Sequence, residues 1–318
     1  MNDYKRESET KMDETKMNEP AAQSGLSRRR LLGTAIGGVA ATTLGRGIAR
    51  AQNQAPITTP VTAVQPVGAK RIQQSVCQWC FGGMPIEKLA EHSAKIGLKG
   101  IDLVGPDAWP TLKKYNLIGT MTPTHGIGKG LNRKENHEEC LGAIRRAIEA
   151  TADAGFPNVI CFSGNRAGMS DAEGLQNCAI GLKQVVGLAE QRGVTICMEL
   201  LNSKRDHGDY MCDRTHWGVE LVKAVGSPRF KLLYDIYHMQ VQEGDVIATF
   251  RAAKDYIGHY HTAGVPGRNE IDDSQELNYE PIMRAIADTG FKGIVAQEFI
   301  PRREPLASLT QAARICDV

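Results

Sequence analysis

Short apolar segments alternate with longer amphipathic segments over most of this chain. Several short segments are apolar on both faces, as at residues 159–162, which is typical of strands buried in a parallel sheet. In a longer segment near 136–154, Leu141, Ile144 and Ile148 recur at helical spacing. The pattern predicts eight strands, at about 72–77, 100–104, 118–123, 158–163, 194–199, 230–235, 257–262 and 293–298.

Glycines mark the ends of the predicted helices. Gly97, Gly155, Gly193 and Gly290 each stand between a predicted helix and the strand that follows it. Glycine readily adopts the left-handed conformation that commonly ends a helix. Eight alternations of strand and helix, without an early glycine-rich phosphate loop, predict a closed (β/α)₈ TIM barrel. An open, doubly wound parallel sheet is the alternative.

The N-terminal region has a different pattern. Residues 1–26 are polar, and Arg28-Arg29-Arg30, a glycine- and alanine-rich stretch and a small-x-small site at 49–51 follow them. This segment resembles a twin-arginine signal, which implies export of the folded protein by the twin-arginine machinery to the periplasm or beyond. It is too polar for a stable membrane anchor, and a basic, solvated N-terminus on a cytoplasmic protein is the alternative. We therefore divide the chain into a signal segment (1–51), a linker (52–70) and a barrel domain (71–318).

Composition narrows the range of partners. The formal net charge is +2 and aromatic residues make up 6% of the chain, so neither a nucleic-acid surface nor a base-stacking platform is indicated. The eight cysteines are scattered. For the Cys77-x-x-Cys80 pair we favour a structural role over a redox role, and a disulfide between the two is left open. A homo-oligomer is also left open.

Four predicted strands in the second half of the chain end in side chains that can bind a metal: Glu199, Asp235, His261 and Glu298. In a barrel these ends converge on the C-terminal mouth, where active sites lie. Three carboxylates crowded there would repel one another unless a cation neutralised them. An oxygen-rich set with one nitrogen favours Mn²⁺, Mg²⁺ or Co²⁺, with Zn²⁺ as a further candidate. Any one of these residues could be a helix cap, but four on consecutive strands favour a metal site. His259 points to the same face of its strand as His261 and is expected one layer deeper in the barrel.

The sequence around these residues resembles that of hydroxypyruvate isomerases. The matching runs are Met198–Asn202, Leu233–Gln240, Ala263–Glu270, Glu276–Tyr279 and Gln297–Phe299. More broadly, residues 70–305 resemble the xylose-isomerase-like barrel superfamily, which includes ketose 3-epimerases. Hydroxypyruvate isomerases often have glutamine where His261 stands, whereas the epimerases have histidine, so the substrate is left open.

The resemblance implies roles for individual side chains. Glu199 and Glu298 would act as proton donor and acceptor while also binding the metal. His238 matches a contact to a substrate hydroxyl in the epimerases. Arg268 lies in the loop where the family places an arginine that faces substrate oxygens, and a solvated loop charge is the alternative for it.

Other residues near the predicted mouth are further candidates. We predict substrate contacts for Asn202, which ends the first matching run, and for His125, which follows the third predicted strand. Trp79 and Trp109 are expected either to form an apolar wall over the substrate or to pack in the core.

These features predict a metal-dependent isomerase that interconverts an aldehyde and a ketone through an enediolate, with hydroxypyruvate and tartronate semialdehyde as the first candidates among sugar and keto-acid substrates. A ketose 3-epimerase or a dehydratase on the same barrel is the alternative. A non-catalytic exported sugar-binding protein is a third hypothesis, against which the matched pair of glutamates argues. A DNA-repair nuclease also uses this fold, but it requires a cluster of several zinc-binding histidines and a basic surface, and this chain has only eight histidines and a small net charge.

Overall fold

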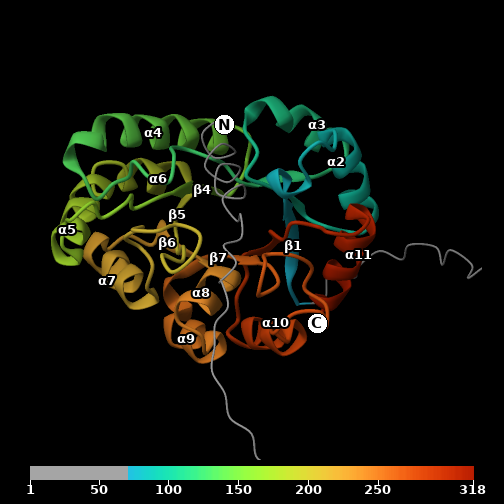
Figure 1. Cartoon of the computed structure of the whole chain (residues 1–318). Helices are drawn as coiled ribbons and strands as arrows, with labels where there is room; N and C mark the ends of the chain where they lie inside the picture. Colours follow the sequence, from blue (N-terminus) through green and yellow to red (C-terminus); the bar gives the residue numbers. More distant parts are fainter. Residues whose placement is uncertain (1–70) are drawn as a thin grey trace, which may run out of the picture. The chain divides into compact units, whose positions relative to one another are not determined.

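The computed structural model describes residues 71–318, in which strands and helices alternate along the chain (Figure 1). The predicted signal segment (1–51) and linker (52–70) lie outside the described residues. The strands are β1 (Gln73–Cys77), β2 (Gly100–Asp102), β3 (Ile118–Met121), β4 (Asn158–Cys161), β5 (Thr195–Glu199), β6 (Phe230–Asp235), β7 (Ile257–Thr262) and β8 (Ile294–Gln297). The α-helices are α2 (Ile86–Lys95), α3 (Trp109–Lys114), α4 (His137–Asp153), α5 (Asp171–Leu182), α6 (Val186–Arg192), α7 (Thr215–Val225), α8 (Ile236–Gln242), α9 (Val246–Ala253), α10 (Tyr279–Asp288) and α11 (Pro305–Ile315), and the 3₁₀ helices are η1 (Gln78–Phe81), η2 (Pro106–Ala108), η3 (Lys134–Asn136) and η4 (Lys254–Tyr256).

The strands form one parallel sheet that closes on itself. Their order in the sheet is β3-β2-β1-β8-β7-β6-β5-β4. The remaining junction, between β3 and β4, is made by a parallel bridge between Thr122 and Val159. The Thr122 amide donates to the Asn158 carbonyl at 2.9 Å, and the Thr122 carbonyl accepts from the Ile160 amide at 3.0 Å. The predicted (β/α)₈ barrel is therefore confirmed, and the doubly wound alternative is wrong.

The strands begin and end close to the predicted positions, and one difference bears on the site. The second strand was expected to reach residue 104, but β2 ends at Asp102. The reason is that Leu103 has a φ of 56°, in the left-handed region that strand residues do not adopt. Asp102 is therefore the last residue of its strand, as Glu199 and Asp235 are of theirs.

The glycines that were expected to end helices do so. Gly97, Gly155, Gly193 and Gly290 have φ angles of 86°, 73°, 71° and 81°. These angles lie in the left-handed region, where a side chain bearing a Cβ is strained and glycine is not. Each glycine therefore turns the chain from a helix back toward the next strand.

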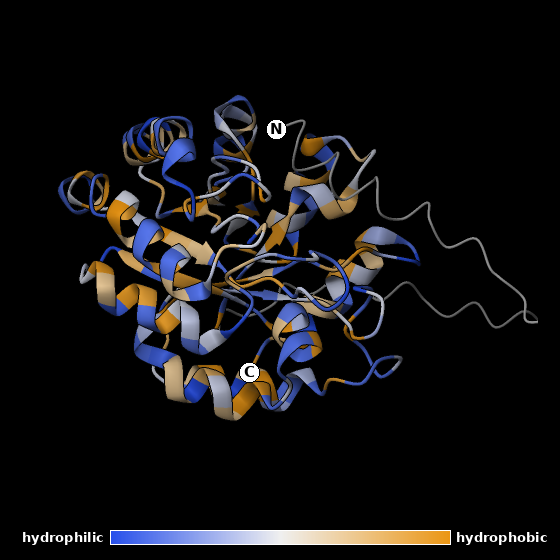
Figure 2. Cartoon of the chain, turned by 60° about the vertical axis from the view of Figure 1, so that its left-hand side comes forward, coloured by the Kyte–Doolittle hydropathy of each residue, from blue (hydrophilic) through white to orange (hydrophobic). Residues whose placement is uncertain are grey.

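The helices pack their apolar sides against the barrel. In α4, Leu141, Ile144 and Ile148 are each at most 2% exposed, so the predicted apolar face is the buried one. Figure 2 shows hydrophilic and hydrophobic residues interspersed along the helices around the barrel, as expected for amphipathic helices. Within residues 71–318, no helix combines the length and apolar character that a membrane crossing requires.

Candidate metal centre

The ends of four neighbouring strands bring the predicted ligands together. Glu199 and Asp235 are the last residues of β5 and β6, His261 is the last but one of β7, and Glu298 directly follows β8. In the sheet register Asp235 pairs with His261, so these two lie side by side. One ligand atom from each of the four residues lies within 4.8 Å of the ligand atoms of the other three.

His261 is central in this group. Its Nδ1 lies 2.9 Å from Glu298 Oε2, 3.5 Å from Glu199 Oε1 and 4.0 Å from Asp235 Oδ2. All four residues are at most 1% exposed. The Nδ1 edge of the imidazole is therefore directed at three buried carboxylates.

Within residues 71–318, three buried carboxylate oxygens of this group have no hydrogen-bond partner. Among the described residues, the unpaired oxygens are Oε1 and Oε2 of Glu199 and Oδ2 of Asp235. A buried ion pair that loses one partner destabilises the folded protein by about 3–5 kcal/mol. A bound cation would compensate for the missing partner of these carboxylates. Three carboxylates and one imidazole are a donor set that suits Mn²⁺, Mg²⁺ or Co²⁺ and that Zn²⁺ also accepts. The residues present thus fit a divalent cation.

The two glutamates differ in their environments. Burial raises the pKa of Glu199 above its ordinary value. Burial acts in the same direction on Glu298, but Arg268 and His261 outweigh it and hold the pKa of Glu298 well below the usual range. Burial, with repulsion from Glu298, raises the pKa of Asp235. Environments that push the pKa values of two carboxyl groups apart are typical of an acid and base pair.

Arg268 and Trp79 hold both oxygens of Glu298. Arg268 Nη2 donates to Oε2 at 2.6 Å, and Trp79 Nε1 donates to Oε1 at 2.9 Å. The guanidinium carbon lies 5.0 Å from the ring centroid of Trp79 and 5.4 Å from that of Tyr237. The Arg268 side chain is 14% exposed, so a solvated loop charge, the alternative for this residue, is excluded. Trp79 belongs to the site, which the sequence left undecided.

His238 presents one ring nitrogen to the ligand group. It lies in the first turn of α8, and its backbone amide donates to Asp235 Oδ1 at 2.9 Å, so the metal-ligand candidate is also the helix cap. Asn202 Nδ2 donates to His238 Nδ1 at 2.6 Å, which leaves the proton of the neutral ring on Nε2. Burial lowers the pKa of His238 well below its ordinary value, so the ring is neutral. Nε2 lies 3.8 Å from Asp235 Oδ2 and has no hydrogen-bond partner among residues 71–318.

Asn202, His125 and Trp109 make their polar contacts outside the group of four predicted ligands. Asn202 bonds Nδ1 of His238, the ring nitrogen on the side away from Asp235, rather than any of the four predicted ligands. His125 Nδ1 lies 3.0 Å from the Gly126 carbonyl, and its Nε2 accepts from the Phe162 amide at 3.4 Å. Its polar contacts are therefore with backbone, and its role as a substrate contact remains a prediction. Trp109 is buried in the core, where its ring packs edge-on against Phe156.

Sequence reasoning missed Asp102. This aspartate is fully buried at the end of β2, and its Oδ2 lies 2.9 Å from His261 Nε2 and 3.2 Å from His259 Nε2. The strand was expected to run to residue 104, which placed Asp102 inside it and hid the strand-end signal that identified the four ligands. Cys77 and Cys80 are buried free thiols, and burial raises the pKa of each.

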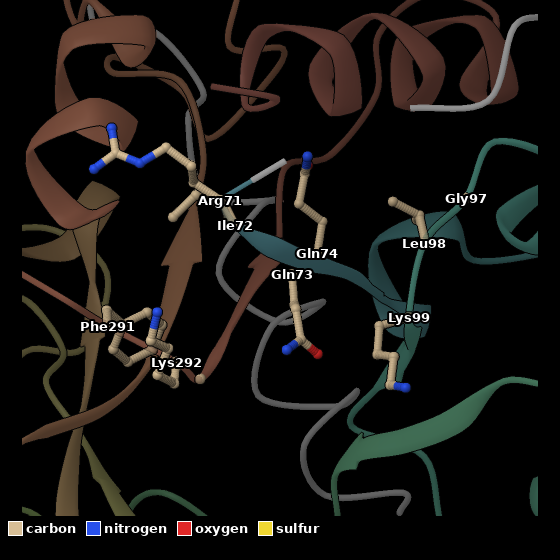
Figure 3. A pocket seen from close by; sticks show the side chains of 10 residues that line it. Arg71, Ile72, Gln73, Gln74, Gly97, Leu98, Lys99, Phe291 and Lys292 are labelled. Carbon is tan, nitrogen blue, oxygen red and sulfur yellow. The ribbon is translucent and has the colours of Figure 1, made fainter. Parts of the chain in front are cut away.

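A surface pocket of about 490 Å³ lies at the other end of the barrel (Figure 3). It is lined by the start of β1, by Lys99 before β2 and by Lys292 before β8. In TIM-barrel enzymes that end carries stability rather than catalysis. The pocket is therefore separate from the candidate metal centre.

Comparison with known proteins identifies the family of this chain. The sequence pattern of the xylose isomerase-like TIM barrel family matches residues 91–316. The hydroxypyruvate isomerase of Escherichia coli is 27% identical over 245 residues, which cover 72% of this chain and 93% of the relative.

Solved structures show the same fold. A protein described as an AP endonuclease of family 2 from Brucella melitensis superposes with a TM-score of 0.68 at 21% identity, over 75% of this chain and 97% of the other. D-psicose 3-epimerase from Clostridium cellulolyticum, with D-tagatose, superposes with a TM-score of 0.62 at 15% identity, over 77% and 96%. At these identities the likeness supports the barrel architecture alone.

Proposed function

Because the chain belongs to the xylose isomerase-like TIM barrel family and is an isomerase, we propose that it interconverts hydroxypyruvate and tartronate semialdehyde by proton transfer between neighbouring carbons. The observation that carries this proposal is the convergence of Glu199 and Glu298 on one buried cation site beside Arg268. A site that only bound a sugar would not need a matched acid and base. The relative from Escherichia coli is named for this reaction.

The proposed cation site consists of Glu199, Asp235, His261 and Glu298. A bound divalent cation supplies the positive charge that stabilises an enediolate, which makes a C–H bond next to a carbonyl more acidic. The geometry favours Mn²⁺, Mg²⁺ or Co²⁺ because most of the donor atoms are oxygens.

The surroundings of the two glutamates favour one direction of proton transfer. Glu298 is ionised, since Arg268 lowers its pKa, and it accepts the proton from the substrate carbon. Burial raises the pKa of Glu199, which favours it as the group that returns a proton to the neighbouring carbon. The hydroxyl proton must also pass from the original hydroxyl oxygen to the original carbonyl oxygen, so that one C–H bond breaks, a new one forms on the neighbouring carbon, and alcohol and carbonyl exchange places.

Arg268 and His238 supply the polar contacts to the substrate. The planar guanidinium suits a carboxylate such as that of hydroxypyruvate, which it can bind through two parallel hydrogen bonds. His238 is neutral and carries its proton on Nε2, so it can donate to a substrate hydroxyl or carbonyl oxygen.

A ketose 3-epimerase is the second candidate, and His261 favours it. Hydroxypyruvate isomerases often have glutamine at this position, and the epimerases have histidine. If the proton returns to the same carbon on its other face, the product is an epimer. Incubation of the metal-loaded protein with hydroxypyruvate and with a panel of ketoses, followed by product analysis, separates the two reactions.

The Glu298→Gln variant tests the proposed chemistry. We expect the exchange of the substrate C–H proton for solvent deuterium to fall by about 10²–10⁴-fold. The matched control is Glu270→Gln, which alters another buried glutamate, one bonded to backbone amides and Ser308 outside the site. Undiminished exchange in Glu298→Gln would show that this residue is not the base.

We also propose export by the twin-arginine machinery, supported by the arginines at 28–30 and the small-x-small site at 49–51. The prediction is that the protein is found outside the cytoplasm and begins near Gln52. Replacement of all three arginines by lysine should retain the full-length chain in the cytoplasm. Export of that variant in cell fractionation would contradict the proposal.

A further inference from the structure

Asp102 joins two histidines below the candidate metal centre. It is fully buried, and its Oδ2 lies 2.9 Å from His261 Nε2 and 3.2 Å from His259 Nε2. Its other oxygen, Oδ1, accepts a hydrogen bond from the hydroxyl of Thr120. Both oxygens of this carboxylate are thus bonded to groups on other strands of the barrel.

These contacts fix the orientation of the His261 ring. A carboxylate accepts hydrogen bonds and does not donate them, so the Nε2 that faces Asp102 carries a proton. Nδ1 points the opposite way, toward Glu298, Glu199 and Asp235 at 2.9, 3.5 and 4.0 Å. By the same rule Nδ1 donates to Glu298 Oε2 unless a cation takes the place of its proton, so the ring keeps its Nε2 proton toward Asp102 and offers Nδ1 to the proposed cation.

We infer that Asp102 is a positioning residue that presents His261 Nδ1 to the cation. The inference rests on the proposed metal-dependent function. A carboxylate that accepts from the far nitrogen of a metal-binding histidine fixes the tautomer and makes the ring a better ligand, and loss of such a partner typically weakens metal binding about 10–100-fold.

In the alternative to this inference, Asp102 is itself a metal ligand. Ligand atoms of Cys77, Asp102 and His261 also lie within 4.8 Å of one another, which could define a second metal site. That site would use His261 Nε2, so the ring would have to lose its last proton to bridge two cations. Cys77 Sγ is 3.8 Å from both Asp102 Oδ2 and His261 Nε2, which is the spacing of a thiol packed beside the pair.

The first experiment measures the affinity of the metal-free protein for Mn²⁺ by competition with a chelating dye, together with the metal-to-protein ratio. We expect Asp102→Asn to bind about 10–100-fold more weakly than wild type, at one cation per chain. The matched control is His259→Gln, which alters the other imidazole on Asp102 and should stay within about threefold of wild type. Equal Mn²⁺ affinity in Asp102→Asn and wild type would overturn the inference.

The second experiment needs no substitution at Asp102. Wild-type protein with ¹⁵N-labelled histidine is loaded with ¹¹³Cd²⁺, and the His259 signals are assigned from their absence in His259→Gln. We expect cadmium–nitrogen coupling at Nδ1 of His261 and a protonated Nε2. Coupling at Nε2, or two cadmium ions per chain that fall to one in Cys77→Ser, would identify Asp102 as a ligand and overturn the positioning role. Wild-type protein that binds neither Mn²⁺ nor Cd²⁺ would contradict the proposed function itself.

Discussion

Arg268 donates a hydrogen bond from Nη2 to Glu298 Oε2 at 2.6 Å, and the same nitrogen lies 3.6 Å from Asp235 Oδ2. A single guanidinium from the loop after β7 thus neutralises charge on two of the four residues proposed to bind the cation. This relationship makes Arg268 a countercharge of the ligand group, a role that can be measured separately from its proposed contact to the substrate.

Arg268→Gln should destabilise the metal-free protein more than the metal-loaded one. Removal of the guanidinium leaves buried carboxylates without their countercharge, which costs about 3–5 kcal/mol when one partner of a buried ion pair is lost. A divalent cation replaces part of that charge. Thermal unfolding with and without Mn²⁺ measures the difference. Equal losses of Tm in the two states would argue against a cation at this position.

Trp79→Phe should lower kcat/KM by about 10–100-fold, because a hydrogen bond to a charged group contributes about 1.5–3 kcal/mol. The phenyl ring can still stack on Arg268, so the variant removes mainly the indole N–H that bonds Glu298 at 2.9 Å. The control is Trp109→Phe, since Trp109 Nε1 bonds the Val104 carbonyl in the core. That change should lower Tm and leave kcat/KM unaltered. A Trp79→Phe enzyme as active as wild type would remove Trp79 from the site.

Removal of the cation by a chelator should abolish the isomerase activity and lower the free energy of unfolding. A ligand present at a thousand times its Kd stabilises the folded state by about 4 kcal/mol. Mn²⁺, Mg²⁺ or Co²⁺ added back should restore both properties. Full activity after exhaustive chelation, verified by metal analysis, would contradict the proposed mechanism.

Glu270 should make stability depend on pH below neutrality. Oε1 of Glu270 accepts from the Arg302 and Arg303 amides at 2.9 and 3.0 Å. Burial alone raises the pKa of Glu270, but these hydrogen bonds and one from Ser308 outweigh it, so the folded-state pKa is lowered. A lowered pKa stabilises the folded protein above the unfolded-state value, about 4.3, and this stabilisation is lost as pH falls through the folded-state pKa.

Urea unfolding of Glu270→Gln at several pH values tests this sign. The variant should be less stable than wild type at pH 7, and the difference should shrink below pH 4. Glu280→Gln is a surface control, because Glu280 pairs with Arg284 on the exposed side of α10 and should have an effect of under about 1 kcal/mol. A difference that grows as pH falls would show that the assigned direction is wrong.

The fold was predictable because its signals are local. Strand segments apolar on both faces and glycines at helix ends lie within a few residues of the structure they specify. The four proposed ligands were predictable for a related reason, since a polar residue at the end of a buried parallel strand must lie at the mouth of a barrel. The early end of β2 at Asp102 was not predictable. Leu103 adopts the left-handed conformation there, but it is not one of the residue types, such as glycine or asparagine, that usually indicate this conformation in a sequence.

The partners of these ligands were decided by the tertiary structure. Asp102 is 159 residues from His261 along the chain, and Trp79 is 219 residues from Glu298, yet each pair is 2.9 Å apart. Closure of the barrel between β3 and β4, the tilt of the strands and the packing of the loops above them set these distances. The sequence by itself determined which side chains reach the mouth of the barrel. Only the folded chain decided which of them touch, because contact depends on the three-dimensional position of residues that no local pattern relates.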